Sequence, residues 1–118
     1  MKAFLLSLLV LSSLSAFAKD CQDEMSTYDI YSCEAAKLKV EDTRLNANYK
    51  SLMAKLDIIG KGKLKAAQRA WITFKDADCA YQADEMRDGS FAKVLLVSCL
   101  SSMTKERADA LQDGVEFR

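Results

Sequence analysis

Apolar residues recur every three or four positions through most of the chain, a spacing that places them on one face of an α-helix. The clearest series lies in the middle of the chain, where Leu64, Ala67, Trp71 and Phe74 share a face. This series predicts a central helix over residues 63–86. A tryptophan flanked by apolar positions packs in a core more often than it anchors a partner, so we expect Trp71 to lie between helices.

A first long helix is predicted over residues 28–56, because one face of this segment is apolar while charged residues occupy the other faces. The apolar face contains Leu38, Leu45, Tyr49, Leu52 and Leu56. Ser26 and Thr27 are both suitable N-cap residues. Residues 57–62 include two glycines and interrupt the pattern, so we interpret them as a loop.

A third helix is predicted after Gly89 and Ser90, which are expected to end the preceding helix and to cap the next one. We expect a kink near residues 101–102, with Thr104 as a second cap, and an end at Gly114 followed by a frayed tail. No strand pattern occurs in the sequence. The prediction is an all-α fold, a small bundle of about three helices in which the second and third form an antiparallel hairpin.

Residues 1–18 are interpreted as a signal peptide. Lys2 precedes an apolar run over residues 4–11, and Ala16-Phe17-Ala18 then gives the small-x-small pattern that signal peptidase cleaves. The alternative is an uncleaved membrane anchor, but the apolar run is shorter than the roughly 20 residues that a spanning helix needs. We therefore expect residues 19–118 to form one exported domain, periplasmic or secreted, that is not embedded in the membrane.

Four cysteines follow this leader: Cys21, Cys33, Cys79 and Cys99. In an oxidising compartment such cysteines pair, and four of them allow three connectivities. Gly89 lies midway between Cys79 and Cys99, so each would stand about 15 Å along its own helix from a turn at Gly89. We therefore expect the disulfides Cys79–Cys99 and Cys21–Cys33.

The composition argues against a reaction centre. The chain has no histidine, which is the commonest general base and metal ligand, and its formal net charge is zero. A neutral chain lacks the basic footprint of a nucleic-acid-binding protein. The cysteine spacings also lack the short Cys-x-x-Cys pairs of zinc sites. We expect no catalytic residue, no metal site and no cofactor.

A polar row on the first helix needs a structural explanation. Asp42, Asn46 and Tyr49 are spaced so that they share a side of this helix with apolar residues. We expect at least part of the row to point toward the other helices. The preferred interpretation is an interhelical network in which Asp42 meets a cation. Its potential partners are Arg69, Lys75 and Arg107.

Asp76 and Asp78 offer a second interpretation, a carboxylate pair for glycoside hydrolysis. Such a pair needs two carboxylates about 5–10 Å apart in a cleft that holds a sugar. A thin bundle of three helices rarely forms such a cleft. We therefore favour a structural role for these aspartates.

The motif residues resemble the secreted domain family typified by the lysozyme inhibitor LprI. The shared positions are Cys33; Asp42, Leu45, Asn46 and Tyr49; Ala67, Gln68, Trp71, Phe74, Lys75, Asp76 and Cys79; and Cys99, Leu100, Thr104, Arg107 and Leu111. They run through most of residues 19–118 in the order and spacing of the family. One departure is Lys75, where the family usually has arginine, because lysine cannot make a planar bidentate contact with a carboxylate.

The resemblance implies a helical, disulfide-linked envelope protein and, for at least one family member, inhibition of lysozyme. We interpret the shared residues as the structural skeleton and expect partner contacts in the loops. Ile58 and Ile59 form one partner-binding candidate. Asp84, Glu85 and Asp88 form an acidic one, suited to the cleft of a basic lysozyme. The leading hypothesis is a protein that blocks a peptidoglycan-cleaving enzyme, and the alternative is a non-inhibitory envelope adaptor or stress protein that docks a resident partner.

Overall fold

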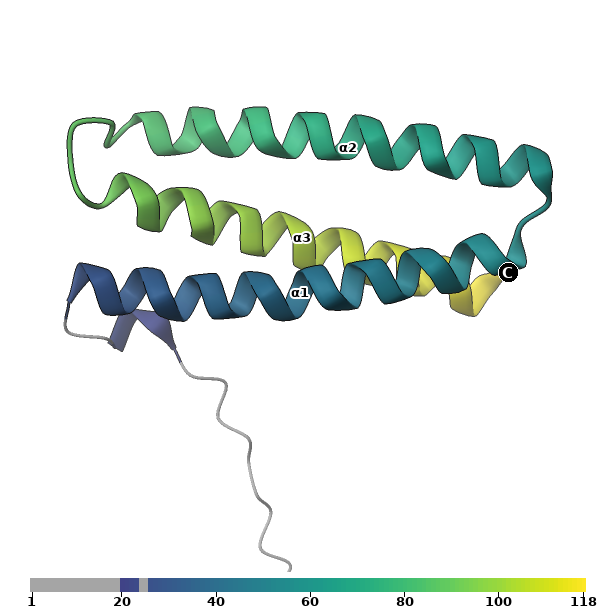
Figure 1. Ribbon diagram of the computed structural model, residues 1–118, viewed down its shortest axis with the longest axis horizontal. Helices are drawn as coiled ribbons and strands as arrows, with labels where there is room; N and C mark the ends of the chain where they lie inside the picture. Colours follow the sequence, from purple (N-terminus) through teal and green to yellow (C-terminus); the bar gives the residue numbers. More distant parts are fainter. Residues whose placement is uncertain (1–19, 24–25) are drawn as a thin grey trace, which may run out of the picture.

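The structure is a computed structural model, which describes residues 20–23 and 26–118. Within these residues a short 3-10 helix, η1 (Cys21–Asp23), precedes three long helices and there is no strand. The long helices are α1 (Thr27–Lys55), α2 (Ile58–Asp84) and α3 (Ala92–Phe117). Helices α1 and α3 run in the same direction and α2 runs opposite to both (Figure 1). The predicted all-α bundle with an α2–α3 hairpin is confirmed, whereas the signal peptide at residues 1–18 lies outside the described residues.

Both expected disulfides are present. Cys21 pairs with Cys33, and Cys79 pairs with Cys99, with a Cα–Cα distance of 5.5 Å in each pair. The first disulfide ties η1 to the beginning of α1, and the second joins α2 to α3. Disulfides of this kind form and persist outside the cytoplasm, so the framework fits an exported protein. None of the helices in the described part of the chain is long and apolar enough to span a bilayer.

The junction between α1 and α2 is shorter than the sequence pattern predicts. Ser26 caps α1 by accepting a hydrogen bond from the Asp29 backbone N–H at 3.0 Å. Asp57 caps α2 in the same way, accepting from the Gly60 backbone N–H at 2.8 Å. The loop expected at residues 57–62 is therefore wrong, since α2 already begins at Ile58. A good N-cap is worth about 1 kcal/mol, which offsets the helix penalty of a glycine.

Helix α3 also departs from its expected limits. It runs unbroken through residues 101–102, so the second cap at Thr104 is wrong. Ser90 does not cap the helix, because the N-cap position is Phe91 and no side chain bonds there. Gly89 has no positive φ, so it does not end α2 as a left-handed glycine. The helix continues past Gly114 to Phe117.

The main core lies between α1 and α3, which pack together more extensively than any other pair of helices. Its fully buried members are Leu45 and Leu52 of α1 with Ala108 and Leu111 of α3. Partly buried residues pack against this cluster, and they are Tyr49, Leu56, Leu64, Trp71 and Val115. Trp71 therefore packs between helices, as expected. Helix α2 supplies only Leu64 and Trp71 to this core.

The face of α2 that meets its neighbours is narrow. Gln68 and Cys79 are buried, and the side chain of Lys75 is only 16% exposed. Phe74 is 60% exposed, so its expected place on the buried face is wrong. The physical reason is that Phe74 precedes Lys75 by one residue, which turns it about 100° around the helix.

The polar contacts between α1 and α3 come from residues that the sequence pattern did not select. Arg44 of α1 donates hydrogen bonds to Glu41 and to Asp109 of α3, and Asn48 donates to the Ala108 carbonyl oxygen at 2.9 Å. The bonds from Arg44, and secondly from Lys105, lower the pKa of the Asp109 carboxyl. These contacts fix the register of α1 against α3.

The expected network around Asp42 is not formed among the described residues. Asp42 and Asn46 are exposed, and Asp42 makes no ion pair with Arg69, Lys75 or Arg107. Arg107 instead donates to Gln68 Oε1 at 2.9 Å, and burial lowers the pKa of its guanidinium. Arg44 and Asn48 each follow a predicted residue by two positions, which is a rotation of about 200° around the helix, so the polar contact lies on nearly the opposite side of α1 from Asp42 and Asn46.

Two glycines within helices allow a matched test of the α1–α3 packing. A Cβ at Gly62 would meet nothing within 4 Å, whereas a Cβ at Gly114 would lie 3.0 Å from Leu52 Cδ2. We expect Gly62→Ala to raise the free energy of unfolding by about 0.5–1 kcal/mol through helix propensity. Gly114→Ala should lower it by about 1 kcal/mol, because the crowding of Leu52 outweighs the same gain. Urea denaturation measures both, and equal stabilisation would contradict the close packing at Gly114.

A buried hydroxyl gives a second test. Thr104 is fully buried, and its Oγ1 has no hydrogen-bond partner in the described residues. Thr104→Val removes an unpaired polar group while conserving shape, so we expect unfolding to cost about 1 kcal/mol more. The matched control is Thr73→Val, because Thr73 is exposed and its Oγ1 donates to the Arg69 carbonyl oxygen. Destabilisation by Thr104→Val in thermal unfolding would show that the hydroxyl does have a partner.

Candidate functional site

A groove of about 880 Å³ lies between the C-terminal half of α2 and the N-terminal half of α3. We call it the acidic groove. It is lined by Asp78, Tyr81, Gln82, Asp84, Glu85, Leu95, Ser98, Cys99, Ser102, Met103 and Glu106. Four of these side chains are carboxylates, and none of the described lining residues is basic. The groove therefore presents a negative surface to any partner that enters it.

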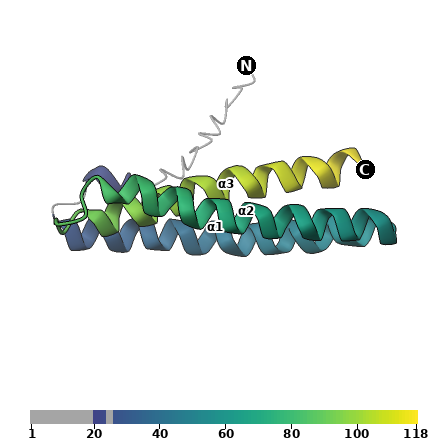
Figure 2. The same cartoon turned by 90° about the horizontal axis from the view of Figure 1, so that it is seen from above.

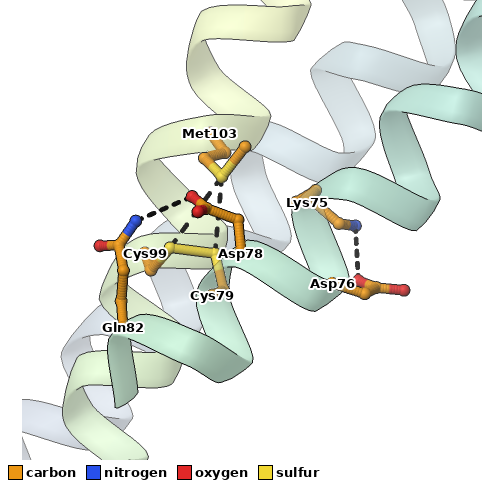
Figure 3. The surroundings of a disulfide bond; sticks show 7 residues. All are labelled: Lys75, Asp76, Asp78, Cys79, Gln82, Cys99 and Met103. Atoms are coloured by element: carbon orange, nitrogen blue, oxygen red, sulfur yellow. Dashed lines mark hydrogen bonds and ion pairs between the residues drawn. A yellow bond between two sulfur atoms is a disulfide. The ribbon is translucent and has the colours of Figure 1, made fainter. Parts of the chain in front are cut away.

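Helical spacing explains how these side chains reach one groove. Asp78, Gln82 and Glu85 are separated by four and three residues along α2, so they follow one side of it. The facing side of α3 carries Cys99 and, seven residues later, Glu106. The disulfide Cys79–Cys99 clamps the two helices at this level (Figure 3). The position of the groove is thus set by the covalent link between α2 and α3.

The walls of the groove near the disulfide are apolar. Met103 Sδ lies 3.6 Å from Cys79 Sγ and 4.0 Å from Cys99 Sγ, and Figure 3 shows Met103 beside the disulfide. These are packing contacts, because disulfide sulfurs carry no hydrogen to donate. Tyr81 lines the groove and is 77% exposed. The site therefore combines carboxylates with an aromatic and a thioether, a composition suited to binding a protein surface.

The carboxylates differ in how far neighbouring groups neutralise them. Asp84 forms an ion pair with Arg87 at 2.8 Å, and Asp78 accepts a hydrogen bond from Gln82 at 2.9 Å. Glu85 and Glu106 make no ion pair with the described residues. These two carboxylates carry the charge that a partner would meet.

The turn after α2 extends the acidic surface beyond the groove. It is closed by three backbone hydrogen bonds, from Met86 to Ala83, from Arg87 to Asp84 and from Gly89 to Met86. A further hollow of about 400 Å³ lies over residues 84–89. The acidic candidate, Asp84, Glu85 and Asp88, is therefore one exposed surface at the end of the groove.

The apolar candidate lies elsewhere. Ile58 and Ile59 form the first turn of α2 and are 87% and 67% exposed. The acidic turn follows the other end of the same helix, so the two candidates occupy opposite ends of the bundle (Figure 1). A partner that contacts only one end of the bundle therefore cannot bind both candidates.

A family model described as "Lysozyme inhibitor LprI" matches residues 18–111. The chain belongs to the LprI lysozyme inhibitor family. An uncharacterized protein of Rhizobium meliloti (strain 1021) is 30% identical over 128 residues, which cover 94% of this chain and 92% of that protein. No solved structure matches the chain. The resemblance carried by the sequence motifs is thus confirmed.

Most of the LprI motif residues fall into two groups in the structure. One group is built into the fold, and it contains the three motif cysteines, Leu45, Tyr49, Gln68, Trp71, Thr104, Arg107 and Leu111. The other group is exposed and contains Asp42, Asn46, Ala67, Phe74 and Asp76. A structural skeleton accounts for the first group and gives no reason for the second.

Lys75, the departure from the LprI pattern, has two partners. Its Nζ lies 5.0 Å from the centroid of the Trp71 ring and 3.5 Å from Asp76 Oδ1. The first is a cation–π contact, which an arginine could also make by stacking. Lys75 therefore covers one face of Trp71 rather than forming a bidentate pair.

The structure does not assemble the carboxylate pair of a glycosidase. Asp76 points to solvent and pairs with Lys75, whereas Asp78 lines the acidic groove and accepts from Gln82 (Figure 3). Residues two apart on a helix do not face each other. The LprI family is described by inhibition, and inhibition needs a binding surface rather than reacting groups.

Sequence reasoning identified the acidic turn but missed most of the groove. Tyr81, Gln82 and Glu106 were not selected. The available signal was the Cys79–Cys99 pairing, which sets α2 and α3 side by side and brings Glu106 to the same side as Asp78. Combining this register with the four-and-three spacing of Asp78, Gln82 and Glu85 would have indicated the groove.

Proposed function

We propose that this protein binds and inhibits a lysozyme or a related peptidoglycan-cleaving enzyme outside the cytoplasm, with the acidic groove and turn as its contact surface. The observation that carries the proposal is the set of four carboxylates around one groove without a basic side chain in its described lining. Membership of the LprI family supports inhibition as the activity.

The charge distribution suits a basic enzyme better than the net charge suggests. The formal net charge is zero, but residues 58–75 contain five basic and no acidic residues, whereas residues 76–88 contain five acidic residues and one arginine. The negative field is therefore concentrated at the end of the bundle that carries the groove. Such complementarity raises the rate of encounter with a positively charged partner and orients it.

The proposed mechanism is occlusion. Glu85 and Glu106 would pair with basic side chains that border the enzyme's cleft, while Tyr81 would provide an aromatic anchor. The groove supplies no chemistry of its own and needs no cofactor. Inhibition should then be reversible, of one-to-one stoichiometry and weaker at high salt, because exposed charges are screened.

The test is the residual lytic activity of chicken-type, goose-type and invertebrate-type lysozymes, titrated with the oxidised protein. We expect saturating inhibition of at least one type on bacterial cell walls. The same titration on a soluble chitin oligosaccharide excludes coating of the walls as the cause. Absence of inhibition of all three at micromolar excess would contradict the proposal and favour the non-inhibitory envelope adaptor or stress protein.

A further inference from the structure

Large apolar side chains are exposed at the end of the bundle opposite the acidic groove. Ile58 and Ile59 stand at the beginning of α2, and Phe117 stands at the end of α3. Ile58 and Phe117 are 87% and 85% exposed. The α1–α2 junction and the C-terminal end of α3 lie at the same end of the molecule (Figures 1 and 2). Lys55 links them, because its Nζ donates to the Val115 carbonyl oxygen at 2.5 Å.

We call Ile58, Ile59 and Phe117 the apolar tip. Its side chains project from the end of the bundle, and none of them lines the acidic groove or the hollow over residues 84–89. A soft interface that closes around such exposed side chains suits this surface.

Basic side chains surround the apolar tip. Lys61, Lys63 and Lys65 lie within the first two turns of α2, and all three are exposed. Helix α1 adds Lys50 and Lys55 to the same end. The acidic residues nearby are Asp57, Asp113 and Glu116. The five lysines therefore outnumber the three acidic side chains at this end of the bundle.

We propose that the apolar tip inserts into the headgroup region of a membrane that contains anionic phospholipids, with the surrounding lysines contacting the phosphates. Exposed isoleucine and phenylalanine side chains gain by leaving water, and lysines near an anionic surface are attracted to it. Neither feature alone would carry the proposal, because single exposed apolar residues are common on protein surfaces. Their coincidence at one end of the bundle is what points to an anionic bilayer.

This mode of binding orients the molecule. Helix α2 has 27 residues and is therefore about 40 Å long, so a bundle standing on its tip holds the acidic groove far from the bilayer. The anionic surface also repels the acidic turn, which favours the same orientation. The proposal does not depend on the identity of the enzyme that the groove binds.

The experiment is flotation of the full chain, produced by export into a bacterial periplasm, with phosphatidylcholine vesicles that contain or lack phosphatidylglycerol. We expect binding only to the anionic vesicles and weaker binding at high salt. Ile58→Ser/Ile59→Ser should weaken binding at least about tenfold, because two apolar side chains no longer insert. Lys61→Gln/Lys65→Gln should weaken binding about 25-fold, since each lysine contributes about fivefold.

The matched controls replace one exposed large hydrophobic side chain and one lysine at the other end of the bundle. Tyr28→Ser and Lys93→Gln should bind the vesicles like the unchanged chain, and far-UV circular dichroism verifies that each variant keeps its helices. Equal binding with and without phosphatidylglycerol, or unchanged binding of the Ile58→Ser/Ile59→Ser variant, would overturn the proposal. So would sedimentation with purified peptidoglycan sacculi in the absence of vesicle binding.

A lysozyme assay in solution separates this proposal from the proposed function. The tip variants should inhibit as the unchanged chain does, because no membrane is present. Loss of inhibition on replacing Ile58 and Ile59 would assign the tip to the enzyme instead and overturn the membrane proposal. Failure of the chain to inhibit any lysozyme would leave the vesicle result intact.

Discussion

Replacing both Cys79 and Cys99 with serine should lower the free energy of unfolding by about 3–5 kcal/mol and abolish inhibition. The disulfide closes a segment with a sequence separation of 20, and its loss restores the entropy of that loop to the unfolded chain. Cys79 is fully buried, so replacing its sulfur with the smaller oxygen of serine would also remove packing contacts. A single domain of this size has a total stability of only about 5–15 kcal/mol, so the loss is a large part of the whole.

The expected effect on inhibition follows from how α2 is held. Helix α2 packs much less extensively against α3 than α1 does. It contributes only Leu64 and Trp71 to the main core, and neither lies in its C-terminal half. The C-terminal half depends on the disulfide and on Ala83, which is its other buried residue. Without the disulfide this half should separate from α3, and the acidic groove between them should open.

Cys21→Ser/Cys33→Ser is the matched control. It removes a disulfide with a sequence separation of 12, which should cost about 2–3 kcal/mol, but it leaves both walls of the groove in place. Urea denaturation followed by circular dichroism measures the stability of both double variants, and the lytic assay measures their inhibition. The prediction is wrong if the two variants inhibit equally well at a temperature where both remain folded.

The success of the disulfide prediction shows which features a sequence specifies locally. Gly89 lies midway between Cys79 and Cys99, and a helix has a constant rise, so equal height along two antiparallel helices follows from counting residues. The apolar series through Leu45 and Leu52 likewise needed only the period of a helix. Both arguments need only residue positions along the chain and the regular geometry of a helix. The fold class and the covalent framework were therefore accessible without a structure.

Glycines misled the prediction because their role depends on neighbouring elements. Gly114 resembles a helix terminator, yet the structure uses it to bring α3 against Leu52 of α1. Gly62 resembles part of a loop, yet it lies within α2, because the helix is capped at Asp57 and begins at Ile58. The contact at Gly114 involves a residue whose position is unknown until the helices are packed, whereas the Asp57 cap is local and was missed in the sequence.

The prediction of the polar network around Asp42 failed for a similar reason. Asp42 and Asn46 share a face with apolar residues when α1 is considered alone, but α1 packs chiefly on α3. The contact is therefore narrower than the apolar face, and Arg44 and Asn48 lie on its edge instead. A sequence indicates the centre of a buried face much better than its borders, where polar contacts and grooves lie. The acidic groove is such a border, which explains why only its turn was predicted.

Reversing two charges of the acidic groove should weaken inhibition about 100-fold or more. Glu85→Lys/Glu106→Lys changes the two carboxylates that have no ion-pair partner among the described residues. Each reversal replaces an attraction to a basic enzyme by a repulsion, and losing one partner of a charge pair at an interface costs about 2–5 kcal/mol. The inhibition constant from a lysozyme titration at low salt measures the effect. Both residues are exposed, so the fold should be unaffected.

The matched control, Asp113→Lys/Glu116→Lys, makes the same change in net charge at the opposite end of the bundle. Both of these residues are exposed on α3, and neither lines the groove. If attraction to a basic enzyme depended on net charge alone, the two variants would lose inhibition equally. If the local field of the groove decides, the control should lose less than about threefold, which is the range expected for remote charges screened by salt.

The salt dependence of inhibition tests whether the enzyme contact lies at the acidic groove or elsewhere. Inhibition by the unchanged chain and by the control should weaken as salt is added, whereas the reversed variant has no attraction left to screen. The inhibition constant of Glu85→Gln/Glu106→Gln should lie between those of the unchanged chain and the reversed variant, because this variant removes attraction without adding repulsion. A reversed variant that still inhibits, with the salt dependence of the unchanged chain, would place the enzyme contact outside the acidic groove. The exposed LprI motif residues Asp42, Asn46 and Phe74 would then be the next surface to replace, since packing gives no reason for them.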